Sequence, residues 1–225
     1  MKSLTHYIQE KLVINSLQEK LVIKKGNHYN YFPKTKEELK AIIKQRIKDE
    51  GNEVDLNDID TSKITDMEGL FWRTDFNGDI SNWDVSNVTD MYGMFYDCKN
   101  FNQDISSWDV SNVTTMENMF FRCTSFNQDI SAWDVSNVTN MKHMFAICQA
   151  FNKDISSWDV SNVTTMENMF FRCTSFNQDI SAWDVSNVTN MKHMFAICQA
   201  FNKDISSWDV SNVTTMENMF FRCTS

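Results

Sequence analysis

The chain has 225 residues, 42% of them hydrophobic, and a formal net charge of −9. Residues 1–50 hold 11 Lys and Arg against 6 Asp and Glu, so the rest of the chain is strongly acidic. An acidic surface repels phosphate groups, which excludes nucleic acid as an expected partner. No apolar run approaches the roughly 20 residues that cross a bilayer, so membrane insertion is not expected either.

The first predicted element is a helix at about residues 35–50, inside an N-terminal capping region of residues 1–51. Thr35 followed by Glu38 fits a capping box, and Gly51 fits a helix terminator. The apolar face of this helix is expected to cover the open end of the repeats that follow, as solenoids require. That face consists of Leu39, Ile42, Ile43 and Ile47.

Internal repeats occupy the rest of the chain. Residues 52–75 form a degenerate first repeat, because DLNDIDTSKITDMEGLFWRTD aligns with DISNWDVSNVTDMYGMFYDCK. Residues 126–175 equal residues 176–225 letter for letter. A fixed period of this length predicts a row of stacked supersecondary units. The six full repeats of 25 residues are 76–100, 101–125, 126–150, 151–175, 176–200 and 201–225.

The spacing of the apolar residues changes halfway through each repeat. Residues 108–111 alternate apolar and polar side chains, which predicts a short strand. Thr114 and Glu117 then fit a capping box that opens an amphipathic helix. The sequence therefore predicts an α/β repeat with one short strand and one short helix per 25-residue coil. The helical spacing rests on Met116, Met119, Phe120 and Cys123.

A single repeat buries too little apolar surface to offset the conformational entropy of ordering its backbone. Stacked repeats cover one another, so their stability comes from neighbour contacts. The cysteines recur every 25 residues and have no second ligand at zinc spacing, which favours buried reduced thiols over disulfides or metal. No cofactor is expected. The cysteines are Cys98, Cys123, Cys148, Cys173, Cys198 and Cys223.

The strongest candidate binding site is the polar face of the predicted strands. Its carboxylates have three interpretations: structural hydrogen bonding, a face for a repetitive ligand, or a metal site. Calcium takes six to eight oxygen ligands, and one Asp and one Ser per coil supply these poorly, so no metal site is expected. The candidate residues are Asp84, Asp109, Asp134, Asp159, Asp184 and Asp209, with Ser86, Ser111, Ser136, Ser161, Ser186 and Ser211.

The segment WDVSNV never varies among the six full repeats, whereas Glu117 is replaced by Lys142 and Tyr92 at equivalent positions. A uniform face suits a periodic partner such as a polysaccharide, because specificity for an irregular protein needs differing contacts. The Trp residues at 25-residue spacing fit either core packing, which is favoured, or sugar stacking. The chain has no phosphate loop, no HExxH and no nucleophile elbow, so no catalytic residue is assigned and no enzyme activity is expected.

The frame CxxFNxDIxxWDVSNVTxMxxMFxxC, as in residues 123–148, resembles the repeat of BspA-type leucine-rich-repeat surface proteins of bacteria. This resemblance covers roughly residues 52–225. It implies a right-handed leucine-rich-repeat-like solenoid and a role in adhesion, or in binding proteins or carbohydrates. Members of the resembled family are usually at the cell surface, but this chain opens with no signal peptide or lipid-attachment cysteine. Its localisation therefore stays unassigned.

Two functions follow as hypotheses. The first is a protein- or carbohydrate-binding adhesion module that uses the uniform polar face. The alternative is a structural spacer or self-assembling scaffold, in an engineered or truncated repeat array, joined through an uncapped C-terminal coil. The sequence reaches Ser225 at a repeat boundary with no second cap, so an exposed apolar flank and end-to-end self-association are expected there.

Overall fold

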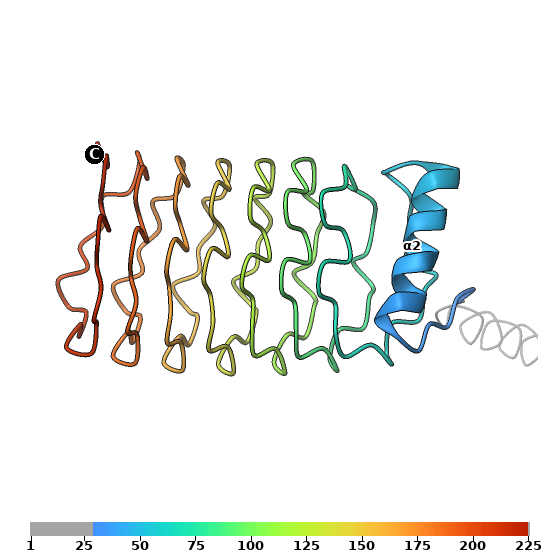
Figure 1. The fold of residues 1–225 in the computed structure, drawn as a ribbon, viewed down its shortest axis with the longest axis horizontal. Helices are drawn as coiled ribbons and strands as arrows, with labels where there is room; N and C mark the ends of the chain where they lie inside the picture. The colour runs from blue at the N-terminus through green and yellow to red at the C-terminus, as the bar shows by residue number, and fades with distance from the viewer. Residues whose placement is uncertain (1–28, 225) are drawn as a thin grey trace, which may run out of the picture.

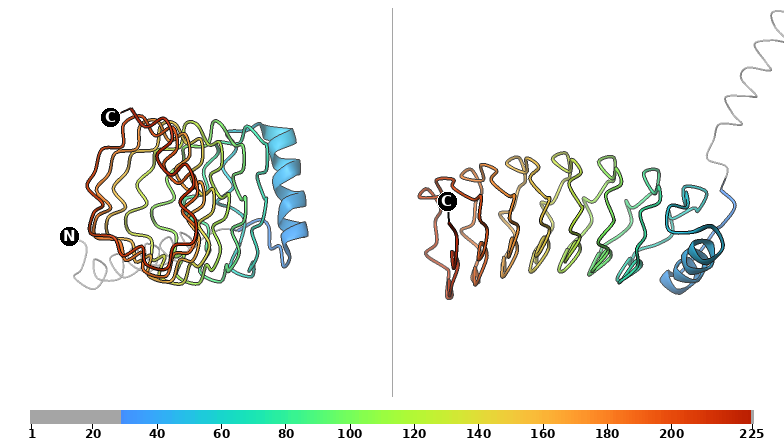
Figure 2. Two further views of the ribbon diagram at one scale, coloured as in Figure 1. Left: turned by 60° about the vertical axis from the view of Figure 1, so that its left-hand side comes forward. Right: turned by 90° about the horizontal axis from the view of Figure 1, so that it is seen from above.

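The structure is a computed structural model that describes residues 29–224. Successive 25-residue repeats form coils that stand side by side in one row, as Figures 1 and 2 show. Helix α2, Lys36–Glu50, lies at one end of this row and the C-terminus lies at the other. The part of the capping region that precedes residue 29 lies outside the described residues.

Helix α2 begins and ends where its capping residues predict. The Thr35 hydroxyl accepts the Glu38 N–H at 3.3 Å, which satisfies one of the unpaired donors of the first turn. Gly51 has a φ of 94°, in a region that favours glycine, and its N–H donates to the Ile47 carbonyl at 2.9 Å. The local sequence is therefore sufficient to fix both ends of this helix.

Helix α2 covers the first coil through apolar and charged contacts. Leu39 and Ile43 are buried in the same core as the repeats. Arg46 pairs with Asp58 at 2.8 Å, and Lys36 pairs with Asp66 at 2.6 Å, so the helix is tied to residues 52–75 at both its ends. Because the helix buries the flank of the first coil, the row of coils has one closed end.

The coils are joined by isolated parallel bridges instead of strands. One bridge residue per coil continues from Asp66 to Thr215, each exactly one coil from the next. The prediction of a strand at residues 108–111 is wrong. There the Val113 N–H donates to the Val110 carbonyl at 2.9 Å and closes a turn. The bridge residues are Asp66, Asp90, Thr115, Asn140, Thr165, Asn190 and Thr215.

The prediction of a helix in each coil is also wrong. Asn118 and Arg122 have φ values of 59° and 61°, which an α-helix of L-residues does not accept. Among the described residues only Lys36–Glu50 forms an α-helix. The segment is instead a chain of turns, in which N–H groups bond alternately within the coil and to the next coil. Met119, Phe121 and Cys123 donate three residues back, while Met116, Asn118, Phe120 and Arg122 donate to the carbonyls of Asn140, Lys142, Met144 and Ala146.

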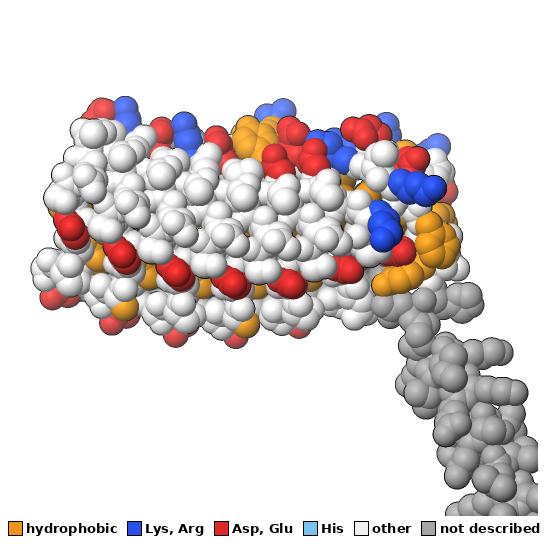
Figure 3. Space-filling model, turned by 90° about the horizontal axis from the view of Figure 1, so that it is seen from below, with side chains coloured by type: hydrophobic (Ala, Val, Ile, Leu, Met, Phe, Trp, Pro, Cys, Tyr) orange, Lys and Arg blue, Asp and Glu red, His pale blue; other side chains and the backbone are white. Residues whose placement is uncertain are grey.

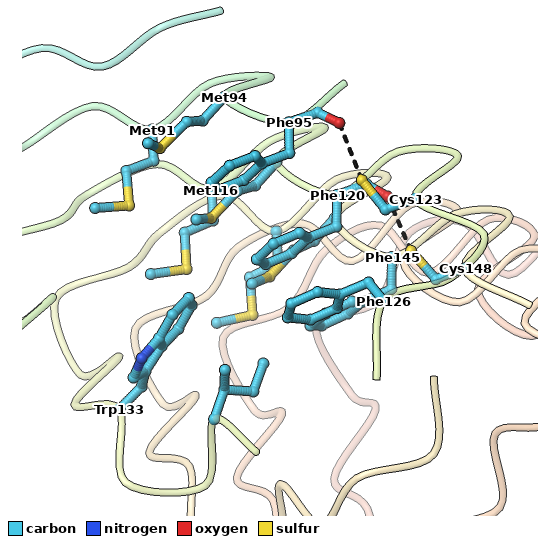
Figure 4. Close-up of a cluster of buried hydrophobic side chains, with 14 of the residues drawn as sticks. Met91, Met94, Phe95, Met116, Phe120, Cys123, Phe126, Trp133, Phe145 and Cys148 are labelled. Carbon is cyan, nitrogen blue, oxygen red and sulfur yellow. Dashed lines mark hydrogen bonds between the residues drawn. The ribbon is translucent and has the colours of Figure 1, made fainter. Parts of the chain in front are cut away.

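The core consists of side-chain columns that run through all the coils (Figure 4). In the main column, Phe95, Phe120 and Phe145 stack with ring centroids 5.5 and 5.7 Å apart. A second column of Phe101, Phe126 and Phe151 packs against the first, so that Phe126 lies 4.1 Å from Phe120. Since each ring contacts equivalent rings of both neighbouring coils, identical sequences give identical interfaces.

Two isoleucines occupy strained backbone positions. Ile147 and Ile197 have φ values of 67° and 63°, although β-branched residues are disfavoured in the left-handed region. We expect Ile147→Asn to raise the free energy of unfolding by about 1 kcal/mol, because Asn tolerates this conformation. Urea denaturation measures the change. Ile147→Val keeps the branch and should bring no gain, so equal effects of the two substitutions would contradict backbone strain as the cause.

Candidate functional site

The twelve predicted site residues lie in turns and not on strands, which corrects their predicted setting. Asp109 Oδ1 accepts the Ser111 N–H at 3.1 Å and the Ser111 hydroxyl at 2.6 Å. This Asp–Ser turn forms because the short Asp side chain can accept a hydrogen bond from the backbone N–H two residues ahead. That local bond competes with the backbone hydrogen bonds of a strand. The same backbone bond, at 3.0 to 3.1 Å, recurs from Asp84, Asp109, Asp134, Asp159, Asp184 and Asp209 to Ser86, Ser111, Ser136, Ser161, Ser186 and Ser211.

A second row of carboxylates makes the same kind of turn in the preceding part of each coil. Asp104 Oδ1 accepts the Ser106 N–H at 2.9 Å, and Asp129 accepts the Ser131 N–H at 3.0 Å. Asp104 is therefore a turn residue as well. Each coil thus carries two Asp side chains in equivalent roles, which provides matched positions for mutagenesis.

Hydrogen bonds from Ser lower the pKa of these carboxyl groups. The Ser111 hydroxyl and N–H lower the pKa of Asp109, and the Ser136 hydroxyl and N–H lower that of Asp134. In the second row, the Ser131 N–H lowers the pKa of Asp129. These hydrogen bonds therefore favour the charged form of Asp109, Asp129 and Asp134. Neighbouring charges oppose this effect, since Asp109 raises the pKa of Asp134.

A ladder of amides and hydroxyls continues from the Asp–Ser turns toward the bridges. Asn112 Nδ2 donates to the Ser86 carbonyl at 2.7 Å, and Thr114 Oγ1 donates to the Thr89 carbonyl at 3.2 Å. The same two bonds recur across each coil junction, and Asn112 and Thr114 are exposed. Asn112 therefore satisfies a backbone carbonyl of the preceding coil from an exposed position. Thr114 is a ladder residue and not a helix cap.

We call the strip formed by Asp109, Ser111, Asn112, Thr114 and their equivalents in the other coils the polar face. In Figure 3 a row of acidic side chains runs along the coils beside a broad area of uncharged polar side chains and backbone. Because bridges join every coil, equivalent side chains recur once per coil along the row. The polar face therefore offers a ligand the same hydrogen-bonding groups at each step.

The tryptophan and cysteine columns lie inside the stack. Trp108 is 3% exposed, and its indole N–H donates to the Ile80 carbonyl at 3.2 Å, which confirms core packing over sugar stacking. Cys123 is buried and its thiol donates to the Phe95 carbonyl at 2.9 Å, a bond drawn in Figure 4. Neither column contributes to the polar face.

The thiols should differ sharply in reactivity. Burial raises the pKa of Cys98 to about 11 and that of Cys198 to about 12, whereas Cys223 is only half-buried. Thiolates are the reactive form, so we expect an aromatic disulfide reagent at pH 8 to modify Cys223 first and the other five at least tenfold more slowly. Cys223→Ser should remove the fast phase. Six equal rates in the folded protein would contradict the buried thiol column.

The loss of stability at acid pH should depend on the Asp–Ser turns. The folded-state pKa of Asp109, Asp134 and Asp184 is below the unfolded value of about 3.9, so their stabilisation is fully present above that pH and is lost as the pH falls from there through the lower folded-state pKa. We expect the melting temperature to drop below pH 4. The triple Asp→Asn variant keeps the acceptor oxygens without titrating, so its profile should be shallower. Superimposable profiles would contradict this origin.

Within residues 29–224, no group of three His, Cys, Asp or Glu side chains is placed to hold a metal ion, and no helix is long and apolar enough to span a bilayer. A cavity of about 230 Å³ lies between α2 and the first coil, lined by Lys40, Lys44, Ile47 and Trp72 among others. This cavity could not be predicted from the sequence, because its shape depends on how α2 packs on the first coil.

These observations define the chain as a tandem-repeat protein with a helical segment at one end. Residues 38–157 and 121–225 match the family described as "Mycoplasma protein of unknown function, DUF285". The two matches together cover most of the chain, which therefore belongs to the DUF285 family. No curated protein and no solved structure matches it.

Proposed function

We propose that this DUF285 chain is a non-enzymatic, right-handed, leucine-rich-repeat-like solenoid of the BspA type that works as an adhesion or binding module through its polar face. The observation that carries the proposal is the recurrence of one exposed arrangement in every full coil. Asp109, Ser111, Asn112 and Thr114 hold the same bonds as their equivalents one coil away.

A polysaccharide is the ligand class that this surface fits best. Its repeating hydroxyls match a row of carboxylates, amides and hydroxyls presented at each coil. The groups are also fixed before binding, because Asn137 and Thr139 are bonded to the preceding coil at 2.7 and 3.3 Å. Preorganised groups lose little conformational entropy when a ligand binds. A periodic ligand gains a further contact set with each coil that it covers.

The experiment replaces one row of carboxylates and keeps its turns. Asp134, Asp159 and Asp184 are exposed, and Asn at each position retains the oxygen that caps the turn. We expect the triple Asp→Asn variant to bind a polysaccharide identified on a glycan array at least tenfold more weakly than the unmodified protein, with unchanged circular dichroism.

The matched control replaces the second Asp row. Asp129, Asp154 and Asp179 are equally exposed and make the same Ser contacts, so their triple Asp→Asn variant changes the net charge by the same amount. Binding should be retained in this control. Equal losses in both variants would indicate general charge effects, and an array without any glycan or protein hit would overturn the binding function.

A scaffold joined end to end is the second candidate. It is favoured by the identical junctions between coils, since coils of one repeat type stack on one another in the same way along the whole row. Sedimentation velocity across a concentration series tests it. A mass that grows with concentration supports the scaffold, and a monomer at every concentration contradicts it.

A further inference from the structure

The cavity of about 230 Å³ between α2 and the first coil has walls that are mainly apolar. Ile43 and Ile47 line it from α2, and Leu70 and Trp72 line it from the first coil. In other proteins, an apolar cavity of about 150 Å³ accepts a benzene molecule. The larger volume found here therefore accommodates a planar group of about two fused rings.

One face of the Trp72 ring is covered, and the other is turned toward the cavity. Tyr96 stacks on Trp72 with ring centroids 3.9 Å apart and 4° between the ring planes, and Phe121 stacks on Tyr96 at 4.6 Å. Tyr96 and Phe121 belong to the next two coils, which lie on the side of the first coil away from α2 (Figure 1). The uncovered face of Trp72 is therefore directed toward α2, where an aromatic ring of a ligand would continue the stack.

Gly93 makes room for this position of the Trp72 ring. A Cβ atom at Gly93 would lie 2.6 Å from Trp72 Cζ3, a distance that side chains do not tolerate. The other full repeats carry Asn or His at this position, as at Asn118 and His143, and they carry Tyr, Phe or Ala at the position of Trp72. The combination of Trp72 with Gly93 is therefore specific to the coils beside the cavity.

Two lysines give the cavity a positively charged rim. Lys40 and Lys44 are the charged residues that line it, and neither forms an ion pair within residues 29–224. By contrast, Lys36 and Arg46 on the same helix pair with carboxylates of the first coil. Like charges four residues apart on a helix repel each other. A carboxylate held by both exposed lysines would remove this repulsion, since it has one oxygen for each.

We propose that this cavity is a binding site for a small aromatic carboxylate. The rings of the ligand stack on the uncovered face of Trp72 and pack against the isoleucines of α2, while the carboxylate pairs with Lys40 and Lys44. Because the site is made by α2 and the first coil together, the bound ligand also links the helix to the repeats. This inference is independent of the polar face and of the scaffold function.

Three probes test which features of the ligand matter. Indoleacetate has two fused rings and a carboxylate, tryptamine has the same rings with an ammonium group, and octanoate has the carboxylate on an aliphatic chain. We expect the full chain to bind indoleacetate at least tenfold more tightly than the other two in isothermal titration calorimetry, because each of them lacks one of the two contacts. No binding of indoleacetate at millimolar concentration, or equal affinity for tryptamine or octanoate, would overturn the proposal.

Charge variants of the full chain locate the carboxylate. The double variant Lys40→Gln with Lys44→Gln should bind indoleacetate at least tenfold more weakly than the unmodified protein. The matched control, Lys34→Gln with Lys48→Gln, removes the same charge from exposed lysines that do not line the cavity, so its affinity should be unchanged. Equal losses in the two double variants would indicate a general charge effect and would rule out this site.

A variant of Gly93 tests the stacking on Trp72 separately. Asn118 has a φ of 59° at the equivalent position and Gly93 has a φ of 54°, so the backbone accepts Asn here. The added side chain of Gly93→Asn nevertheless displaces the Trp72 ring, while both lysines stay in place. We expect this variant to bind indoleacetate at least fivefold more weakly, with unchanged circular dichroism. Full affinity would contradict stacking on Trp72 as the basis of binding.

Discussion

Phe170→Ala should lower the free energy of unfolding by about 3–5 kcal/mol, the usual range for removing a fully buried phenylalanine. Phe170 is 0% exposed, and its ring stacks on Phe145 and Phe195 at 5.8 and 5.7 Å. The cavity would open between two coils that are held together mainly by this column. Chemical denaturation followed by tryptophan fluorescence measures the loss.

The repeat supplies its own control for this substitution. Phe220 has the same sequence neighbours, but it is 48% exposed and stacks only on Phe195, at 5.6 Å. We expect Phe220→Ala to cost less than half as much as Phe170→Ala, because the rings that cover Phe170 from the next coil, Phe176, Trp183 and Phe195, have no counterpart at Phe220 among the described residues, and about half of the burial is absent. Equal losses would mean that sequence context, and not the covering coil, sets the energy of the column.

Deleting residues 151–200 should leave a folded protein with lower stability. The deletion joins Ala150 to Phe201, which repeats the natural junction of Ala150 with Phe151, so every remaining coil keeps its neighbour type. At about 0.05–0.15 kcal/mol per residue, removing 50 residues should lower the free energy of unfolding by about 2.5–7.5 kcal/mol. Circular dichroism and urea denaturation test both parts of this expectation.

An out-of-phase deletion is the control. Removing residues 151–197 shifts the last coil by three positions, so its Phe, Trp and Cys columns no longer meet those of the preceding coil. This variant should lose the last coil, although it retains more residues than the in-phase deletion. If both deletions were equally stable, the matching of columns between coils would not be the source of stability.

Alternating Glu and Lys give neighbouring coils an order that the uniform core does not. The Phe, Trp and Cys columns are alike in every full coil, so they accept any coil as a neighbour. The Lys142–Glu167 and Lys192–Glu217 pairs recur at alternate junctions, and partly exposed pairs of this kind contribute to register more than to stability. The polar face is therefore uniform, whereas the alternating Glu and Lys residues specify which coil comes next.

Much of this molecule could be predicted from its sequence. Thr35 and Gly51 carry the capping chemistry of α2, which depends only on neighbouring residues. The buried Trp, Met, Phe and Cys positions follow from their 25-residue recurrence, since a side chain that repeats in register stacks on its own equivalent.

The conformation inside each coil was decided by tertiary structure alone. The spacing of Met116, Met119, Phe120 and Cys123 fits a helix, but turns closed over three residues bury the same side chains. The helix and the chain of turns differ in the acceptors of alternate N–H groups. In the structure those acceptors are carbonyls of the next coil. The sequence determined the repeat, the buried positions and the end cap, because those depend on residues and their period. The backbone path of residues 116–123 depended on hydrogen bonds between residues about 25 positions apart, which a local pattern does not encode.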